Sequence, residues 1–166
     1  MRIAPLFAAF LTLALAAPAF AKNAGSNSSE PHWEAQPLYT TIDLTAGFDN
    51  DPRTVSLEAG GEHNAEGIGS GCGGFINWEK PDVDVNYESG DEKLHFYVKA
   101  DKDTTLVVYT PDRKWVCADD ISEANLNPVI SFDHPQKGNY NIWVGTYEAG
   151  ATQQATLYVS ELDPPR

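Results

Sequence analysis

The nearest candidate for a catalytic nucleophile in this sequence is Ser70, in the stretch Gly69-Ser70-Gly71-Cys72. A serine hydrolase needs a serine, a histidine base, an orienting carboxylate and backbone donors for the oxyanion. The stretch matches neither Gly-Asp-Ser-Gly-Gly nor the Gly-x-Ser-x-Gly elbow. We therefore interpret it as a glycine-rich turn that lets the chain pass close to the cysteine, and we expect no catalytic residues.

Residues with oxygen-bearing side chains are frequent on both sides of Cys117, the second of the two cysteines. Calcium binds about six to eight oxygens from carboxylates, Asn side chains and carbonyls. If Thr104–Tyr109 pairs with the next strand as a hairpin, the acidic residues at its outer end crowd together and repel unless a cation intervenes. The sequence therefore predicts a calcium site, with solvated loop acids as the alternative, because the spacing is not that of an EF-hand. The predicted ligands are Asp101, Asp103, Asp119, Asp120, Asn125 and Asn127.

The chain has two cysteines, Cys72 and Cys117. An even, small count in an exported chain favours a disulfide. The alternatives are a reactive thiol or a metal ligand, but there is no Cys-x-x-Cys. The four histidines share no ligand spacing, so neither zinc nor copper is expected.

Tryptophans offer a second kind of binding chemistry, because their rings stack on glycans or peptides. Trp115 lies two residues before Cys117, where packing against a disulfide is expected, and Trp143 is expected in the core. Trp78 lies near a turn and is the candidate for ligand stacking.

Elements that could position these residues are short. Apolar residues alternate with polar ones within residues 38–44, 55–57, 83–87, 94–98, 129–132, 140–146 and 155–159. Thr104–Tyr109 is apolar on both faces, as a central strand would be, and turn residues separate the runs. No stretch keeps helical spacing over three turns. The prediction is an all-β single domain with one disulfide, an antiparallel β-sandwich or jelly roll.

The first residues have the three parts of a secretory signal peptide: Met1-Arg2, an apolar run over 3–17 and the ending Ala19-Phe20-Ala21. The run is too short and too rich in Ala to span a bilayer, and no Cys follows to carry a lipid. We expect residues 1–21 to be removed, 22–37 to be a flexible segment and 38–166 to form the β-sandwich. The mature protein is expected to be secreted or periplasmic, with no membrane insertion.

The chain is acidic, with 24 Asp and Glu against 11 Lys and Arg and a formal net charge of −13. Residues 1–21 contain one basic residue, Arg2, and no acidic one, so the expected mature chain carries −14. Such a surface repels nucleic acid and anionic lipid and tolerates cations and cationic partners. The expected partner is an unidentified protein or glycan, and the chain is expected to be a monomer.

Residues 87–147 carry a further pattern. A Gly-Asp turn leads into an apolar strand, and an Asp begins the next predicted strand. A Pro-Asp turn then precedes an aromatic residue and a Cys. Acidic and Asn residues follow, and a Gly-x-Tyr strand ends the segment. These features are at Gly90-Asp91, Leu94–Val98, Asp103–Val108, Pro111-Asp112, Trp115–Cys117, Asp119-Asp120, Asn125–Pro128 and Gly138–Val144. The segment resembles a pre-peptidase C-terminal domain, a β-sandwich module appended to many secreted bacterial proteases. The resemblance implies a sandwich fold, and related modules use calcium to order such loops.

The chain also resembles a set of small exported proteobacterial proteins that are often labelled trypsin-like peptidases. The shared features are Gly47-Phe48, Asp51-Pro52, Gly60-Gly61, Gly71–Ile76 and Trp143–Tyr147. This sequence departs from that label because it lacks a recognisable catalytic triad.

The predicted function is therefore that of an exported, non-enzymatic binding or accessory β-sandwich protein, stabilised by calcium. Two alternatives stay open. One is a secreted, peptidase-like hydrolase acting through Ser70 or an acidic pair, and the other is a peptidase inhibitor that presents a rigid exposed loop.

Overall fold

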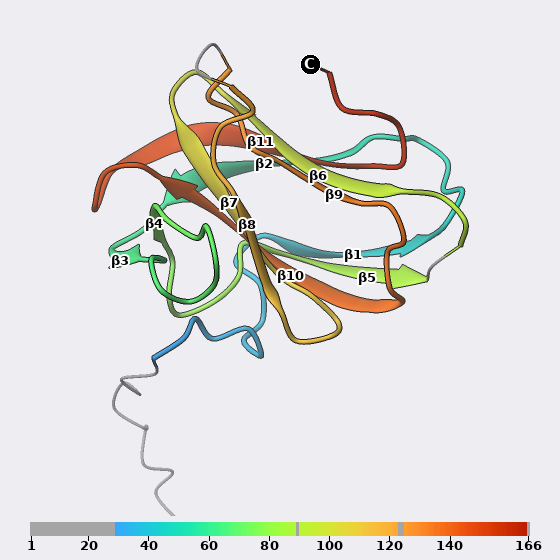
Figure 1. Ribbon diagram of the computed structural model, residues 1–166, viewed down its shortest axis with the longest axis horizontal. Coiled ribbons are helices and arrows are strands. Elements are labelled where there is room, and N and C mark those ends of the chain that lie inside the picture. The colour runs from blue at the N-terminus through green and yellow to red at the C-terminus, as the bar shows by residue number, and fades with distance from the viewer. Residues whose placement is uncertain (1–28, 89, 123–124, 166) are drawn as a thin grey trace, which may run out of the picture.

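The computed structural model describes residues 29–88, 90–122 and 125–165, and within these ranges the chain folds into eleven strands and no helix. The strands form two sheets that stack as a sandwich (Figure 1). The predicted all-β sandwich is confirmed. The predicted signal peptide, residues 1–21, lies outside the described residues, as do residues 22–28 of the predicted flexible segment.

The larger sheet has seven strands and is built around β10. Its members are β1 (Thr40–Thr45), β3 (His63–Asn64), β4 (Phe75–Ile76), β5 (Val83–Glu88), β7 (Thr104–Tyr109), β8 (Trp115–Ala118) and β10 (Gly138–Thr146). One edge of β10 pairs with β5 and then with β4, while its other edge pairs with β7, which pairs with β8. Since β7 has a neighbour on both sides and every residue buried, it is the central strand that the sequence predicts.

The smaller sheet is antiparallel throughout. It consists, in order, of β2 (Arg53–Gly60), β11 (Thr152–Ser160), β6 (Leu94–Ala100) and β9 (Val129–Phe132). In the larger sheet one pair, β1 with β5, runs parallel. The chain between them crosses to the smaller sheet as β2 and returns through residues 61–82, which is long enough for the crossover that a parallel pair requires.

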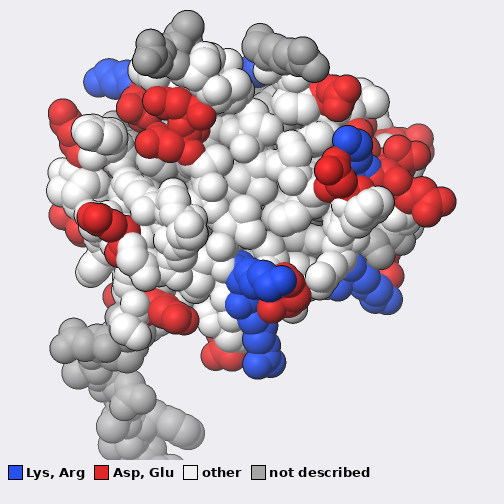
Figure 2. All heavy atoms as spheres, viewed as in Figure 1, with Lys and Arg blue, Asp and Glu red and all other residues white. Residues whose placement is uncertain are grey.

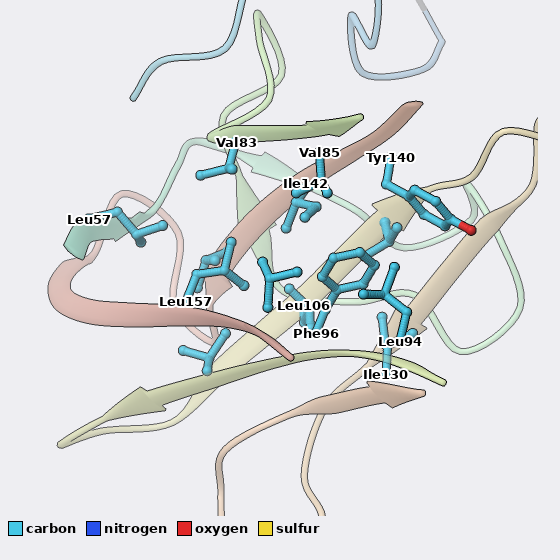
Figure 3. Close-up of a cluster of buried hydrophobic side chains, with 14 of the residues drawn as sticks. Leu57, Val83, Val85, Leu94, Phe96, Leu106, Ile130, Tyr140, Ile142 and Leu157 are labelled. Atoms are coloured by element: carbon cyan, nitrogen blue, oxygen red, sulfur yellow. The ribbon is translucent and has the colours of Figure 1, made fainter. Parts of the chain in front are cut away.

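The main core lies between the two sheets, as Figure 3 shows for side chains of both layers. Alternation decides which residues enter it: Val83, Val85 and Tyr87 of β5 are buried, whereas the residues between them face outward. Phe96 and Leu157 meet them from the smaller sheet. Burying each large apolar side chain contributes roughly 1.5–3 kcal/mol, so this layer holds the sheets together.

A second, smaller apolar cluster covers part of the outer face of the larger sheet. Its members are Ala65, Ile76, Val107, Tyr109 and Trp143, with Trp33, Ile68, Trp78, Trp115 and Cys117 packed against them. The predicted disulfide between Cys72 and Cys117 is confirmed, and it attaches the segment between β3 and β4 to β8 across a sequence separation of 45. Trp143 is fully buried, as predicted.

Among the described residues no helix is long and apolar enough to cross a bilayer.

Candidate functional site

The β7–β8 hairpin brings together two acidic segments that the sequence singles out. Leu106 pairs with Ala118, so the residue before β7 and the residues after β8 meet at the same end of the hairpin. Asp103 directly precedes β7, and Asp119 and Asp120 directly follow β8. The hairpin on which the calcium prediction depends is therefore present.

Asp103, Asp119 and Asp120, the acidic triad, form a tight group of carboxylates. Each offers an oxygen, and these oxygens lie within 4.8 Å of one another. Asp103 is half-buried and the other two are exposed. Figure 2 shows acidic side chains gathered at this end of the molecule, where β6 leads into β7. Three carboxylates at such range can hold a cation, whose charge would relieve their repulsion.

The environment of Asp103 and Asp119 disfavours ionisation of these two carboxyl groups. Burial, followed by the charges of Asp119 and Asp120, raises the pKa of Asp103. Burial and then the charge of Asp120 raise the pKa of Asp119. The Oδ1 atom of Asp103 is also enclosed and accepts no hydrogen bond. The group is thus under electrostatic strain that a bound cation would remove.

Of the other predicted calcium ligands, Asp101 is not part of the acidic triad, and Asn125 and Asn127 make hydrogen bonds of their own. The Oδ1 atom of Asn127 accepts a hydrogen bond from the Ala100 N–H at 2.9 Å. The Oδ1 atom of Asn125 accepts from the backbone N–H and the side-chain amide of Asn127, at 3.3 and 3.2 Å. Asp101 is exposed in the turn between β6 and β7. The two asparagines therefore shape the loop that follows the triad.

Beside the acidic triad lies a hollow of about 270 Å³. It is lined by Lys102, Asp103, Thr146, Tyr147, Glu148, Ala151, Thr152 and Gln153. The Gln153 side chain fixes one wall, because its Nε2 donates to the carbonyls of Lys102 and Asp103 at 3.2 and 2.8 Å. Tyr147 is 68% exposed at the rim. We call this part of the molecule, residues 101–103, 119–122 and 147–151, the loop end.

Comparison with known proteins gives only distant likeness, and that to solved structures. No family model matches the chain, and no curated protein matches it. Among solved structures it is similar to Aeromonas hydrophila PliG, a periplasmic lysozyme inhibitor of g-type lysozyme. The sequence identity is 14%, the TM-score is 0.37, and the match covers 73% of this chain and 96% of that chain. A likeness this distant assigns neither a family nor a function.

Ser70 is exposed in the segment that carries Cys72. Within the part of the chain that the structure describes, its hydroxyl has no hydrogen bond to a histidine or a carboxylate. The turn around it is held by the disulfide and by a hydrogen bond from the Cys72 N–H to the Gly69 carbonyl at 3.3 Å. Ser70 therefore stands without the base that a nucleophilic serine requires.

A serine–histidine pair that sequence reasoning missed lies on the smaller sheet. Ser131 is directly opposite His95 in the β6–β9 ladder, and 2.7 Å separate Ser131 Oγ from His95 Nδ1. His95 is 3% exposed, its Nε2 is enclosed without a partner, and burial is the main cause that lowers its pKa. A triad needs a carboxylate on the second ring nitrogen, so the pair is incomplete. Only the strand register, which no motif encodes, could have revealed it.

Trp78, the predicted stacking residue, is half-buried and packs against the second apolar cluster. Its ring lies 5.4 Å from that of His63. Trp115 lies between Tyr109, at 4.6 Å, and Trp143, at 5.4 Å. These contacts place the tryptophans mainly in a packed layer beside the disulfide.

Proposed function

We propose that this chain is an exported, non-enzymatic binding protein of the pre-peptidase C-terminal type and that the loop end is its binding surface. The observation that carries the proposal is the acidic triad, three carboxylates held together by the β7–β8 hairpin beside a hollow with an exposed tyrosine. The disulfide agrees with a place outside the cytoplasm, since such bonds persist in oxidising compartments.

Calcium is the cation that we propose for the acidic triad. Its oxygen preference and tolerance of irregular geometry suit carboxylates on two loop segments, with water and backbone carbonyls completing the shell. Binding would join the start of β7 to the segment after β8. That connection would order residues 119–122, which include the exposed Ile121 and are hydrogen-bonded to Asn125, next to the exposed Leu126.

The partner that we propose for the loop end is a cationic protein. The chain has a formal net charge of −13, and a field of that sign speeds the approach of a positive partner. Acidic residues beyond the triad, Asp101 and Glu148, would still face the partner with calcium bound. Exposed Tyr147 and Ile121 of the loop end, with the nearby exposed Leu126, supply apolar contact area of the kind that stabilises interfaces.

Binding of a short oligolysine peptide tests where cationic groups dock. In 20 mM salt without calcium we expect saturable binding that weakens in Asp119→Asn with Asp120→Asn. The matched control is Asp91→Asn with Glu92→Gln, which changes the charge equally at the opposite end of the sandwich, before β6. Equal loss in both double variants would show that net charge alone attracts the peptide, and it would contradict a binding surface at the loop end.

A second candidate function is inhibition of a secreted peptidase. The observation that favours it is the segment from Gly67 to Gly71, which is largely exposed yet attached to β8 by the disulfide. A rigid exposed loop loses little conformational entropy when an enzyme binds it. Titration against secreted serine peptidases would show stoichiometric inhibition that Ser70→Arg abolishes and that Asp119→Asn leaves intact. Full peptidase activity at equimolar protein would remove this candidate.

No hydrolytic turnover is expected from the chain itself. A screen of chromogenic esters and peptides should give the same background rate for the wild type, Ser70→Ala and Ser131→Ala. Turnover that disappears with either substitution would make the protein an enzyme and overturn the proposal.

A further inference from the structure

The outer face of the larger sheet carries an ordered array of amides and carboxylates that the loop end does not explain. The strand register places Asp43 of β1, Asn86 of β5 and Asn139 of β10 in one cross-strand row. The next row contains Asp84 of β5 and Asn141 of β10. These five positions alternate with core residues along their strands, so all of them face away from the core.

Hydrogen bonds fix the side chains of both rows. Asn86 Nδ2 donates to Asp43 Oδ1 at 2.8 Å, and Asn139 Nδ2 donates to Asn86 Oδ1 at 2.9 Å. In the second row, Asn141 Nδ2 donates to Asp84 Oδ1 at 2.8 Å. Each bond uses one donor or acceptor of groups that have several. Asn141 is buried, so it is mainly the first row that presents further donors and acceptors to solvent, in positions that are set before any ligand arrives.

The first row opens to solvent in a shallow hollow. Asp43 and Asn86 are exposed and Asn139 is half-buried. With Thr45, Glu88 and Lys137 they line a space of about 480 Å³. Lys137 Nζ lies 2.7 Å from Glu88 Oε2, so these two charges neutralise each other. The hollow is polar without a surplus of positive charge, which disfavours a phosphate-rich ligand.

Aromatic rings border the second row. Asn141 is directly opposite Tyr109 of β7, and the ring of Trp33 stacks on Tyr109 at 5.0 Å with an interplanar angle of 30°. Trp33 is half-buried, so part of its ring reaches solvent. Neighbouring strands are about 4.8 Å apart and alternate residues about 6.8 Å apart along a strand. The rings therefore lie within the length of a short oligosaccharide from Asn139.

We propose that this face binds an uncharged glycan chain. Sugar hydroxyls both donate and accept hydrogen bonds, and they match a surface on which amide and carboxylate groups alternate. The apolar faces of sugar rings pack on aromatic side chains such as Trp33. A peptide strand cannot be inserted between these residues, because β5 is paired with β1 and β10 over both rows and β10 is paired with β7 from Asn141 onward.

The test uses cellohexaose, xylohexaose and chitohexaose as probes, with the chain from Lys22 to Arg166. At millimolar concentration, at least one probe should shift the side-chain amide resonances of Asn86 and Asn139 in a saturable manner. Asn86→Ala with Asn139→Ala should weaken that binding about tenfold, since two hydrogen-bonding groups are lost. The control, Ser56→Ala with Gln154→Ala, truncates two exposed polar residues on the smaller sheet and should bind as the wild type does.

Any of three results would overturn the proposal. One is the absence of any amide shift with all three glycans while the wild type is folded. The second is equal binding by both double variants. The third is a shift at Asn86 and Asn139 that a neutral peptide such as hexaglycine produces and the glycans do not. Binding of oligolysine at the loop end is unaffected by any of these outcomes, so this inference and the proposed function fail separately.

Discussion

At the scale of single residues, Asp82 makes hydrogen bonds where the pairing in the larger sheet changes. It directly precedes β5, at the point where the pairing of β10 changes from β5 to β4. Its Oδ2 accepts a hydrogen bond from the Val144 N–H at 2.7 Å, and its backbone pairs with Ile142 and Tyr39. Asp82 is 2% exposed. Burial raises its pKa to about 7, against the opposing effect of the Val144 hydrogen bond.

Asp82→Asn should change how stability depends on pH. The pKa of Asp82 is higher in the folded chain than in the unfolded one, so the folded state binds the extra proton and is stabilised by it at low pH. That contribution, on the order of a few kcal/mol, is lost as the pH rises from about 4 through 7. Asparagine keeps an acceptor for Val144 and cannot ionise. Urea unfolding at pH 5 and pH 8 should therefore show a smaller difference in the variant, whereas parallel pH curves would contradict the assignment.

The acidic triad shows what sequence reasoning can reach at this scale. Asp103, Asp119 and Asp120 were predictable, because they flank two strands that a short turn makes into a hairpin. The engagement of Asn125 and Asn127 in hydrogen bonds within their own loop was not predictable, since it depends on local side-chain geometry. The pair of His95 and Ser131 likewise depends on strand register.

At the scale of elements, the alternating runs predicted the long strands and their buried faces. Two features escaped that reasoning. Strands β3 and β4 have two residues each, too few for a periodic pattern. The second apolar cluster includes Trp33, which lies in a segment rich in Ser, Asn and Pro where no period marks it. Its burial follows from a partner, Tyr109, that is distant in sequence.

The disulfide is the covalent support of this second cluster. Cys72→Ala with Cys117→Ala should lower the free energy of unfolding by about 2–5 kcal/mol, because the loop between the cysteines is no longer constrained in the unfolded chain. Tryptophan emission should also shift as Trp33 and Trp115 gain solvent, while far-ultraviolet circular dichroism keeps its β signal. An unfolding curve and an emission spectrum identical to those of the oxidised wild type would show that the cluster does not need the bond.

At the scale of the whole molecule, charge and fold act together at the loop end. The sandwich supplies a rigid frame, and the connections at this end gather carboxylates from two segments of an already acidic chain. A cation that binds the folded chain alone raises its stability by about 2.7 kcal/mol at a hundredfold excess over Kd. For a domain of this size, that corresponds to a rise in Tm of roughly 5–10 °C.

The melting curve with and without calcium tests the central claim most directly. Millimolar calcium at matched ionic strength should raise the Tm of the wild type by roughly 5–10 °C. It should leave the Tm of Asp119→Asn with Asp120→Asn unchanged, and this variant should be folded without calcium because it has fewer like charges in contact. The Asp91→Asn, Glu92→Gln control should respond as the wild type does. A wild-type Tm that calcium does not move would contradict the account and leave the acidic triad as solvated loop residues.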